Sequence, residues 1–421
     1  MRSSLLSLAA STLTATTLLT SPALAATEVE FWHAFTGTNG SAVDTLAERF
    51  NASQDDYEIV PVYTGKYAEG TTKLTAAIAG NTAPGLVMLE ITRYGLFADR
   101  GALEPLQPMI DAAGDLTEQI RPFALEASKY LGESYVIPFN VSTPVMYYNK
   151  DAFAAAGLDP ESPPATWDAL LEAAEALTLR EGDEVTQWGI APPPQWVRWA
   201  MTNQAGGGWV DPADNAVQID EPGSVRAYQT AADWVNVHKV ASLEAALSED
   251  VSDEYFITGR AAIEFDSTGG LTRQLEEAPF DLGVAPLPCD AVCAAPIGGA
   301  TLGIVASAPE DVKDGAWAFI AFVTNPENNA FIFAETGYLP IMKTAIDLPA
   351  AQAVIEANPA YTIANDQLEV AFARARPPAM PAIRSEEPAV WEEIVLGTSA
   401  EEALAEFGEK MRAMIARGQA G

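Results

Sequence analysis

The sequence predicts an α/β protein of two lobes, and three observations lead to this class. Strand patterns alternate with helical patterns over residues 29–90, an order typical of an open, largely parallel sheet with helices on both faces. The segment Phe139–Asp151 has the pattern of a strand that leaves one compact unit and enters another. The length of 421 residues, with 48% hydrophobic and 19% charged residues, is globular in composition and sufficient for two buried cores.

The elements of the first unit are expected from Val29 onward. Val29 and Phe31 alternate with acidic residues, which predicts a strand. Ser41 with Asp44 resembles a capping box, and the apolar residues after them share one helical face. The elements expected next are a strand beginning at Tyr57, a helix over Glu69–Ala79 and a buried strand over Leu86–Glu90.

The second unit is expected to follow the crossover segment. Thr166 is predicted to cap a helix that carries Trp167 and Leu170 on one face. The later expected elements are a buried strand over Ala261–Phe265, a turn and strand over Ile297–Val305, an apolar helix over Trp317–Val323 and a C-terminal helix over Glu401–Arg417. We expect the chain to cross between the lobes more than once, so that both lobes are discontinuous in sequence.

Residues 1–25 have the pattern of a cleavable signal peptide. Arg2 supplies a positive start, Leu5–Leu19 form an apolar run, and Ala23-Leu24-Ala25 is a small-x-small cleavage site. No later apolar run is long enough to span a bilayer. We therefore expect a soluble protein exported to the periplasm.

Charge and motif content exclude several function classes. The formal net charge is −35, and no Lys/Arg stripe suited to phosphate backbones is present, so nucleic acid is not an expected partner. The sequence contains no G-x-S-x-G elbow, no P-loop and no H-E-x-x-H motif, and only two histidines. We therefore expect no enzymatic activity and no cofactor.

The two cysteines, Cys289 and Cys293, are candidates for a disulfide. Export into an oxidising compartment permits the bond. Two cysteines alone make a poor zinc shell, and His33 and His238 lie far away in sequence, so no metal site is expected.

Several residues are candidates for ligand binding, although each also has a purely structural interpretation. Trp196 and Trp199 are spaced to share a helix face, where they either pack between elements or form an aromatic wall for a polyol or a cation. Other polar and aromatic residues stand near strand ends or turns, where ligands bind in open α/β sheets. These residues are Tyr67, Glu90, Ser142 and Tyr338. Gly298-Gly299 and Gly269-Gly270 are turn glycines that also let backbone N–H groups approach an anion.

A series of short motifs, in order along the chain, resembles the periplasmic sn-glycerol-3-phosphate-binding proteins of bacterial ABC importers. The resemblance covers nearly the whole mature chain. The motifs are Phe31-Trp32-His33, Arg49-Phe50-Asn51-Ala52, Ile59-Val60-Pro61, Phe139–Asp151 continuing to Pro160, Gly298-Gly299-Ala300, Thr336–Ile341 and Met380–Arg384. Two segments depart from the family pattern: Cys289–Cys293, and Gly206–Gly208, which is able to reshape the pocket wall.

The resemblance implies a set of nine ligand-binding residues. Glu90 would accept hydrogen bonds from glycerol hydroxyls, Trp196 and Trp199 would flank the carbon chain, and Arg384 would grip the phosphate. The full implied set is Tyr67, Glu90, Ser142, Trp196, Trp199, Ser267, Gly299, Tyr338 and Arg384.

The resemblance also implies a periplasmic binding protein-like fold, with two discontinuous α/β lobes around a hinged ligand cleft. We expect the first lobe to comprise residues 26–138 plus about 270–325, and the second 139–269 plus about 326–421. The implied function is high-affinity capture of sn-glycerol-3-phosphate, extended to glycerophosphodiesters such as glycerophosphocholine, for inner-membrane ABC permease subunits. We expect a monomer. The alternatives are a sugar- or oligosaccharide-binding protein of the same architecture and, less favoured, a secreted hydrolase.

Overall fold

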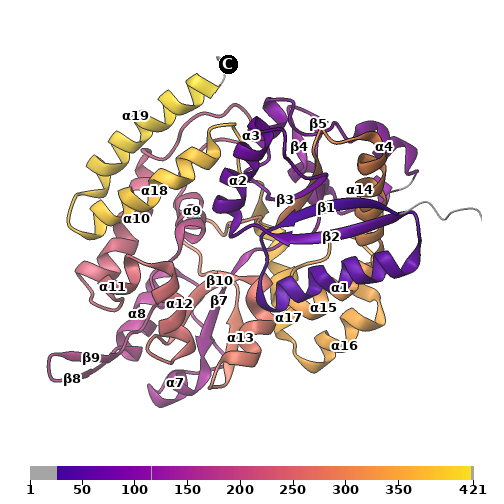
Figure 1. Cartoon of the computed structure of the whole chain (residues 1–421). Coiled ribbons are helices and arrows are strands. Elements are labelled where there is room, and N and C mark those ends of the chain that lie inside the picture. The colour runs from indigo at the N-terminus through magenta and orange to yellow at the C-terminus, as the bar shows by residue number, and fades with distance from the viewer. Residues whose placement is uncertain (1–25, 115, 419–421) are drawn as a thin grey trace, which may run out of the picture.

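The structure is a computed structural model that describes residues 26–114 and 116–418 (Figure 1). One lobe surrounds the sheet that contains β1 (Thr27–His33), and the other surrounds the sheet that contains β7 (Pro144–Asn149). The predicted signal peptide lies outside the described residues. The two-lobed α/β class predicted from the sequence is confirmed.

The sheet of the first lobe has five strands in the order β2-β1-β3-β13-β6. Besides β1, these strands are β2 (Tyr57–Tyr63), β3 (Leu86–Glu90), β13 (Ala300–Ile304) and β6 (Ile137–Pro138). The first three strands are parallel, as predicted, because helices α1 (Gly37–Ser53) and α2 (Tyr67–Ala79) connect them. The strand β13 runs antiparallel to both β3 and β6.

The buried strand β3 explains the continuous apolar run in its sequence. Leu86 and Met88 face a core that includes α1 and α14 (Glu310–Val323). Val87 and Leu89 face the opposite side, where Leu74 of α2 packs. Because successive side chains of a strand point to opposite faces, a strand covered on both faces needs apolar residues at every position.

The first helix begins earlier than predicted. The capping box assigned to Ser41 and Asp44 is wrong, because α1 begins at Gly37 and Ser41 lies inside the helix. Gly37 has a φ of 56°, a left-handed conformation that glycine adopts without strain. This turn allows the helix to start four residues before Ser41.

The second sheet has three antiparallel strands in the order β10-β7-β11. The outer strands are β10 (Ile263–Ser267) and β11 (Leu282–Ala285). In β7, Met146 and Tyr148 face one core while Val145 and Tyr147 face another, and all six residues are buried. The crossover strand is therefore the centre of the second lobe.

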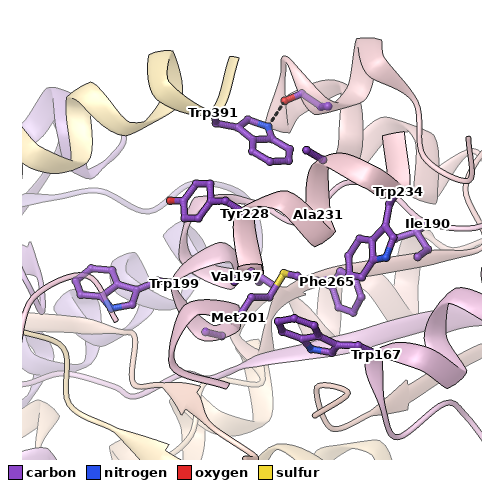
Figure 2. Close-up of a cluster of buried hydrophobic side chains, with 14 of the residues drawn as sticks. Trp167, Ile190, Val197, Trp199, Met201, Tyr228, Ala231, Trp234, Phe265 and Trp391 are labelled. Atoms are coloured by element: carbon purple, nitrogen blue, oxygen red, sulfur yellow. Dashed lines mark hydrogen bonds between the residues drawn. The ribbon is translucent and has the colours of Figure 1, made fainter. Parts of the chain in front are cut away.

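Helices cover the second sheet and bury its largest core (Figure 2). The helices of this lobe are α7 (Lys150–Ala155), α8 (Trp167–Leu177), α9 (Gln195–Gln204), α10 (Pro222–Asn236), α11 (Leu243–Ala246), α12 (Glu249–Ile257), α18 (Met380–Val395) and α19 (Ala400–Gly418). The cap predicted at Thr166 is confirmed, since its hydroxyl accepts a hydrogen bond from the Ala169 N–H (3.2 Å). Trp391 of α18 packs in the same core and donates to the Ala246 carbonyl (2.7 Å).

The remaining elements are short or connect the two lobes. The helices among them are α3 (Gly95–Asp99), α4 (Gln107–Ala112), α5 (Leu116–Gln119), α6 (Pro122–Ala127), α13 (Leu271–Glu277), α15 (Pro326–Thr336), α16 (Pro349–Ala357), α17 (Ala360–Asp366), and the 3-10 turns Thr268–Gly270, Ala345–Asp347 and Gln367–Val370. The strands among them are β4 (Lys129–Tyr130), β5 (Glu133–Ser134), β8 (Leu179–Glu181), β9 (Glu184–Gln187), β12 (Ala295–Pro296) and β14 (Ala371–Phe372).

The sheet order changes one of the expected lobe boundaries. The sequence assigned residues from about 270 to the first lobe, but β11 pairs with β7 in the second sheet. The chain enters the first sheet again only at β13, which pairs with β3. The rest of the proposed division stays a prediction.

Cys289 and Cys293, in the connection between β11 and β13, are joined in a disulfide.

Leu302 of β13 provides a test of this core. It is fully buried between β3 and β6, so Leu302→Ala should lower the free energy of unfolding by about 2–5 kcal/mol through lost burial and a cavity. The matched change Leu396→Ala, at a side chain that is 61% exposed, should cost less than about 0.5 kcal/mol. Urea titration measures both values, and equal losses would contradict the described packing.

Candidate functional site

The candidate site lies where the chain passes between the two lobes. Glu90, the last residue of β3, is opposite Ala300, the first residue of β13. Immediately before β13, Gly298 forms a bridge with Ser142, and Val141 forms another with Leu339. Backbone pairing therefore brings together four regions that are distant in sequence and that contain Glu90, Ser142, Gly299 and Tyr338.

Close packing at glycines shows which side chains converge there. A Cβ atom on Gly298 would lie 2.6 Å from the Ser142 Oγ and 3.1 Å from the ring of Trp196. On Gly269, a Cβ atom would lie 2.3 Å from the ring of Tyr338. Ser142, Trp196 and Tyr338 therefore approach backbone that only glycine leaves accessible.

Ser267 and Tyr67 occupy the same region as Tyr338. The Ser267 hydroxyl accepts a hydrogen bond from the N–H of Gly269 (3.0 Å), the residue against which Tyr338 packs. Phe35 stacks on Tyr338 with ring centroids 5.5 Å apart and meets Tyr67 edge-on at 6.1 Å. Burial, followed by the nearby Tyr338 and Glu90, raises the pKa of Tyr67. The buried Tyr67 hydroxyl has no hydrogen-bond partner among the described residues, so it remains able to bind a ligand.

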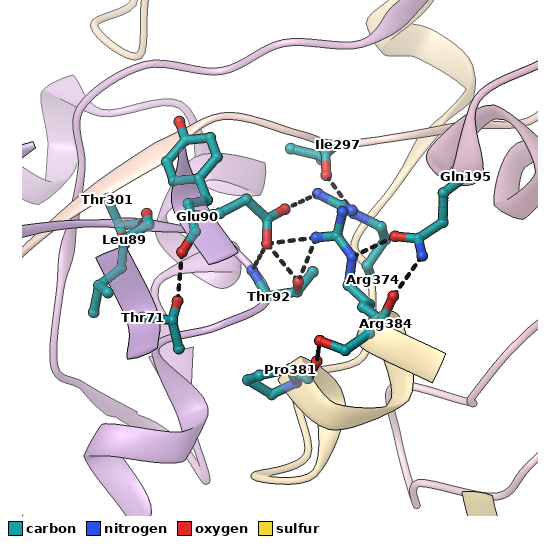
Figure 3. A network of polar contacts seen from close by, with 12 residues as sticks. Thr71, Leu89, Glu90, Thr92, Gln195, Ile297, Thr301, Arg374, Pro381 and Arg384 are labelled. Carbon is teal, nitrogen blue, oxygen red and sulfur yellow. Dashed lines mark hydrogen bonds and ion pairs between the residues drawn. The ribbon is translucent and has the colours of Figure 1, made fainter. Parts of the chain in front are cut away.

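Glu90 is the centre of a buried network of charges (Figure 3). One carboxylate oxygen pairs with Arg374, and the other with the Arg384 guanidinium (2.9 Å). The Thr92 N–H donates to the same carboxylate (3.0 Å), and Arg384 also donates to the Thr92 hydroxyl (3.2 Å). Since Glu90 belongs to the first lobe and Arg384 to α18 of the second, this network joins the lobes.

The arginines dominate the electrostatics of this network. Burial alone would raise the pKa of Glu90, but Arg374, Arg384 and Arg93 outweigh it and lower the pKa to about 2. Burial, together with the like charge of Arg384, lowers the pKa of Arg93 to about 10. Two guanidinium groups therefore pair with one carboxylate, and the positive charge of a third, Arg93, also acts on it. A second acid, Glu249, lies near this network, because its carboxylate accepts a hydrogen bond from the backbone N–H of Gln195 (3.0 Å). The three arginines still outnumber the two acids, Glu90 and Glu249.

A second layer of polar contacts orients Arg384. The Gln195 side chain accepts from the Arg384 Nε (2.9 Å) and donates to the Arg384 carbonyl (2.7 Å). Glu387 accepts from Gln195 (3.1 Å) and forms two bonds of 2.8 Å with Arg198. These contacts fix the position of the Arg384 guanidinium.

Trp199 is placed differently from the other eight predicted residues. Its indole is 1% exposed and stacks on Trp209 with centroids 4.6 Å apart. The guanidinium of Arg374 lies 5.4 Å from the Trp199 ring, so Trp199 forms the support behind Arg374. The divergent segment Gly206–Gly208 leads directly into Trp209 and thus contributes to this support. The predicted contact of Trp199 with a ligand stays a prediction.

Sequence reasoning missed Arg93, Thr92, Gln195 and Arg374. Thr92 and Arg93 stand two and three residues after Glu90, at the end of a strand. Because ligands bind at strand ends in open α/β sheets, this position alone could have identified both as candidates. Gln195 precedes the predicted Trp196. Arg374 lies in an irregular segment after β14, and no periodic pattern or turn motif marks it. Among the described residues, no cluster of His, Cys, Asp and Glu is able to hold a metal ion.

Comparison with known proteins adds independent findings. A family model described as bacterial extracellular solute-binding protein matches residues 45–363. The chain is 33% identical over 361 residues to the sn-glycerol-3-phosphate-binding periplasmic protein UgpB of Escherichia coli K12, covering 82% of this chain and 81% of that protein.

Solved structures give the same architecture. The crystal structure of UgpB from Mycobacterium tuberculosis in complex with glycerophosphocholine matches with a TM-score of 0.82 and 29% identity, covering 93% of this chain and 98% of that chain. A substrate-binding protein from Listeria monocytogenes in complex with cycloalternan matches with a TM-score of 0.84 and 23% identity, over 93% and 99% of the two chains. The second likeness concerns the fold alone.

The pKa of Glu90 predicts how stability depends on pH. A carboxyl group whose pKa is about 2 in the folded state, against an ordinary value of 4.5, stabilises the fold above pH 4.5. That contribution should be lost as the pH falls from 4.5 to about 2. Urea titrations across this range should give a steeper decline for the wild type than for Glu90→Gln, and parallel declines would contradict the described ion pairs.

The two tryptophans should respond differently to truncation. Trp199→Ala removes a fully buried, stacked ring and should lower the free energy of unfolding by about 3–5 kcal/mol. Trp196 is only partly buried, so Trp196→Ala should cost less than half of that. Equal losses in thermal unfolding would show that the two rings are not placed as described.

Proposed function

The chain belongs to the bacterial extracellular solute-binding proteins, and we propose that it captures sn-glycerol-3-phosphate in the cleft at Glu90 for delivery to an ABC importer. The excess of guanidinium groups around one carboxylate carries this proposal. A phosphate monoester is an anion, and arginine binds phosphate oxygens through paired, charge-assisted hydrogen bonds. A neutral sugar gives no reason to bury three arginines together.

The predicted binding residues other than Trp199 divide the roles in this proposal. The Arg384 guanidinium, held by Gln195, shares its donors between Glu90 and the phosphate. The free Tyr67 hydroxyl and the Gly299 N–H are candidate partners of phosphate oxygens, and Glu90 is a candidate acceptor for a glycerol hydroxyl. Trp196, against Ser142 and Gly298, offers an apolar surface to the three-carbon chain. Ser267 and Tyr338 border the same turn.

Binding and release then require motion of the lobes. The residues proposed to hold the ligand come from both lobes, so closure completes the site and opening releases the ligand. We propose that the closed form presents itself to inner-membrane ABC permease subunits from the periplasm, as a monomer. Among the described residues, no helix has both the length and the apolar character needed to cross a membrane. The proposed role is transport and includes no chemical step.

Arg384 provides the test that separates a phosphate ligand from a neutral one. A charged hydrogen bond contributes roughly 1.5–3 kcal/mol, so Arg384→Gln should weaken sn-glycerol-3-phosphate binding by about a hundredfold. The matched control is Arg180→Gln on β8, whose exposed side chain donates to the Lys239 carbonyl far from Glu90 in the sequence. Calorimetry measures the affinities, and thermal unfolding checks that each variant folds.

The same titrations distinguish the alternatives. Tight binding of maltose by the wild type, with no uptake of sn-glycerol-3-phosphate or glycerophosphocholine, would favour a sugar-binding protein and reject the proposal. Release of choline during incubation with glycerophosphocholine would instead identify a hydrolase.

A further inference from the structure

A groove of about 740 Å³ lies beside the Glu90 site. Residues of α2 and α3 form its wall on the first lobe, and residues of α18 and α19 form its wall on the second. The hydroxyl-bearing residues among those that line it are Thr71, Thr72, Thr75 and Ser385. The groove is therefore an interlobe space in which hydroxyl groups stand among apolar residues.

The groove and the candidate site share their walls. Arg93 and Ser385 line the groove, and each follows directly in sequence a member of the Glu90 network, Thr92 and Arg384 respectively. Ala68, which also lines the groove, follows Tyr67 at the start of α2. A ligand held at Arg384 therefore has this groove next to it.

The charges along the groove are mainly positive. Arg93, Arg100 and Arg417 line it together with a single acid, Asp99, whose carboxylate already accepts a hydrogen bond from the Tyr130 hydroxyl (2.7 Å). Arg93 is only 7% exposed, and its Nε has no hydrogen-bond partner among the described residues. A buried guanidinium with a free donor is costly unless something binds it. This pattern is notable in a protein of net charge −35.

We propose that the groove receives the alcohol substituent of a glycerophosphodiester whose phosphate is held at Arg384, and that it selects substituents that are polyhydroxylated or anionic over cationic ones. This inference rests on the proposed function of the site. The threonine and serine hydroxyls donate to backbone carbonyls of their own helices, so they offer acceptor oxygens to the hydroxyl groups of a polyol. The three arginines repel a quaternary ammonium group, and the described lining contains no aromatic cage that would bind one.

Calorimetry with two diesters tests the selectivity. The probes are sn-glycero-3-phosphoglycerol and sn-glycero-3-phosphocholine, with sn-glycerol-3-phosphate as the reference ligand. The wild type should bind the glycerol diester at least about fivefold more tightly than the choline diester, the scale expected for one partly screened charge interaction. High salt should reduce this preference.

Variants connect the preference to the groove. The double variant Arg100→Gln/Arg417→Gln changes two exposed side chains, so it should fold, and it should reduce the preference to about twofold or less. Arg93→Gln should reduce the preference for the glycerol diester further. If the Arg93 variant does not fold, the double variant alone still tests the proposal. Arg180→Gln, on the exposed β8 strand, should keep the full preference.

The outcomes are distinguishable. A wild type that binds the reference ligand but prefers the choline diester, or a double variant with an unchanged preference, would overturn the selectivity alone. A wild type that binds none of the three ligands would overturn both the proposed function and this inference.

Discussion

The pairing of Glu90 with Arg374 and Arg384 is the interaction on which the rest of the site depends. A carboxylate buried to this degree is stable only when it is paired and hydrogen-bonded, and here Arg374, Arg384 and Thr92 supply those partners. The pair between Glu90 and Arg384 crosses between the lobes, so it also fixes how the lobes meet. Strand pairing makes this possible, since it places the end of β3 beside the segments that pass between the lobes.

The same network reconciles a strongly acidic protein with an anionic ligand. The net charge of −35 is spread over a surface where salt screens it beyond roughly 10 Å at about 0.1 M. The buried arginines are screened much less, so the local excess of positive charge determines what the cleft attracts. The anion therefore does not need to be attracted from a distance by the charge of the whole protein. Gln195, itself bonded to Glu387, holds the Arg384 guanidinium in position for it.

The sequence was informative where local patterns determine structure. The apolar run of β3, the crossover strand β7 and the cap at Thr166 were all predictable. A strand buried on both faces needs a continuous apolar run, and a helix start favours a residue such as threonine, so both can be recognised from a few neighbouring residues. Non-local pairing was not predictable, and β11 was assigned to the wrong lobe for that reason. Arg374 was missed because an isolated arginine in an irregular segment has no pattern. The stacking of Trp199 on Trp209 likewise depends on tertiary packing.

A crystal structure with bound sn-glycerol-3-phosphate would show directly which side chains hold the phosphate. We expect a phosphate oxygen at about 3 Å from the Arg384 guanidinium, with a glycerol hydroxyl donating to the Glu90 carboxylate. A phosphate bound away from these arginines, with the ion pairs of Glu90 unchanged, would show that the Glu90 network is not the binding site.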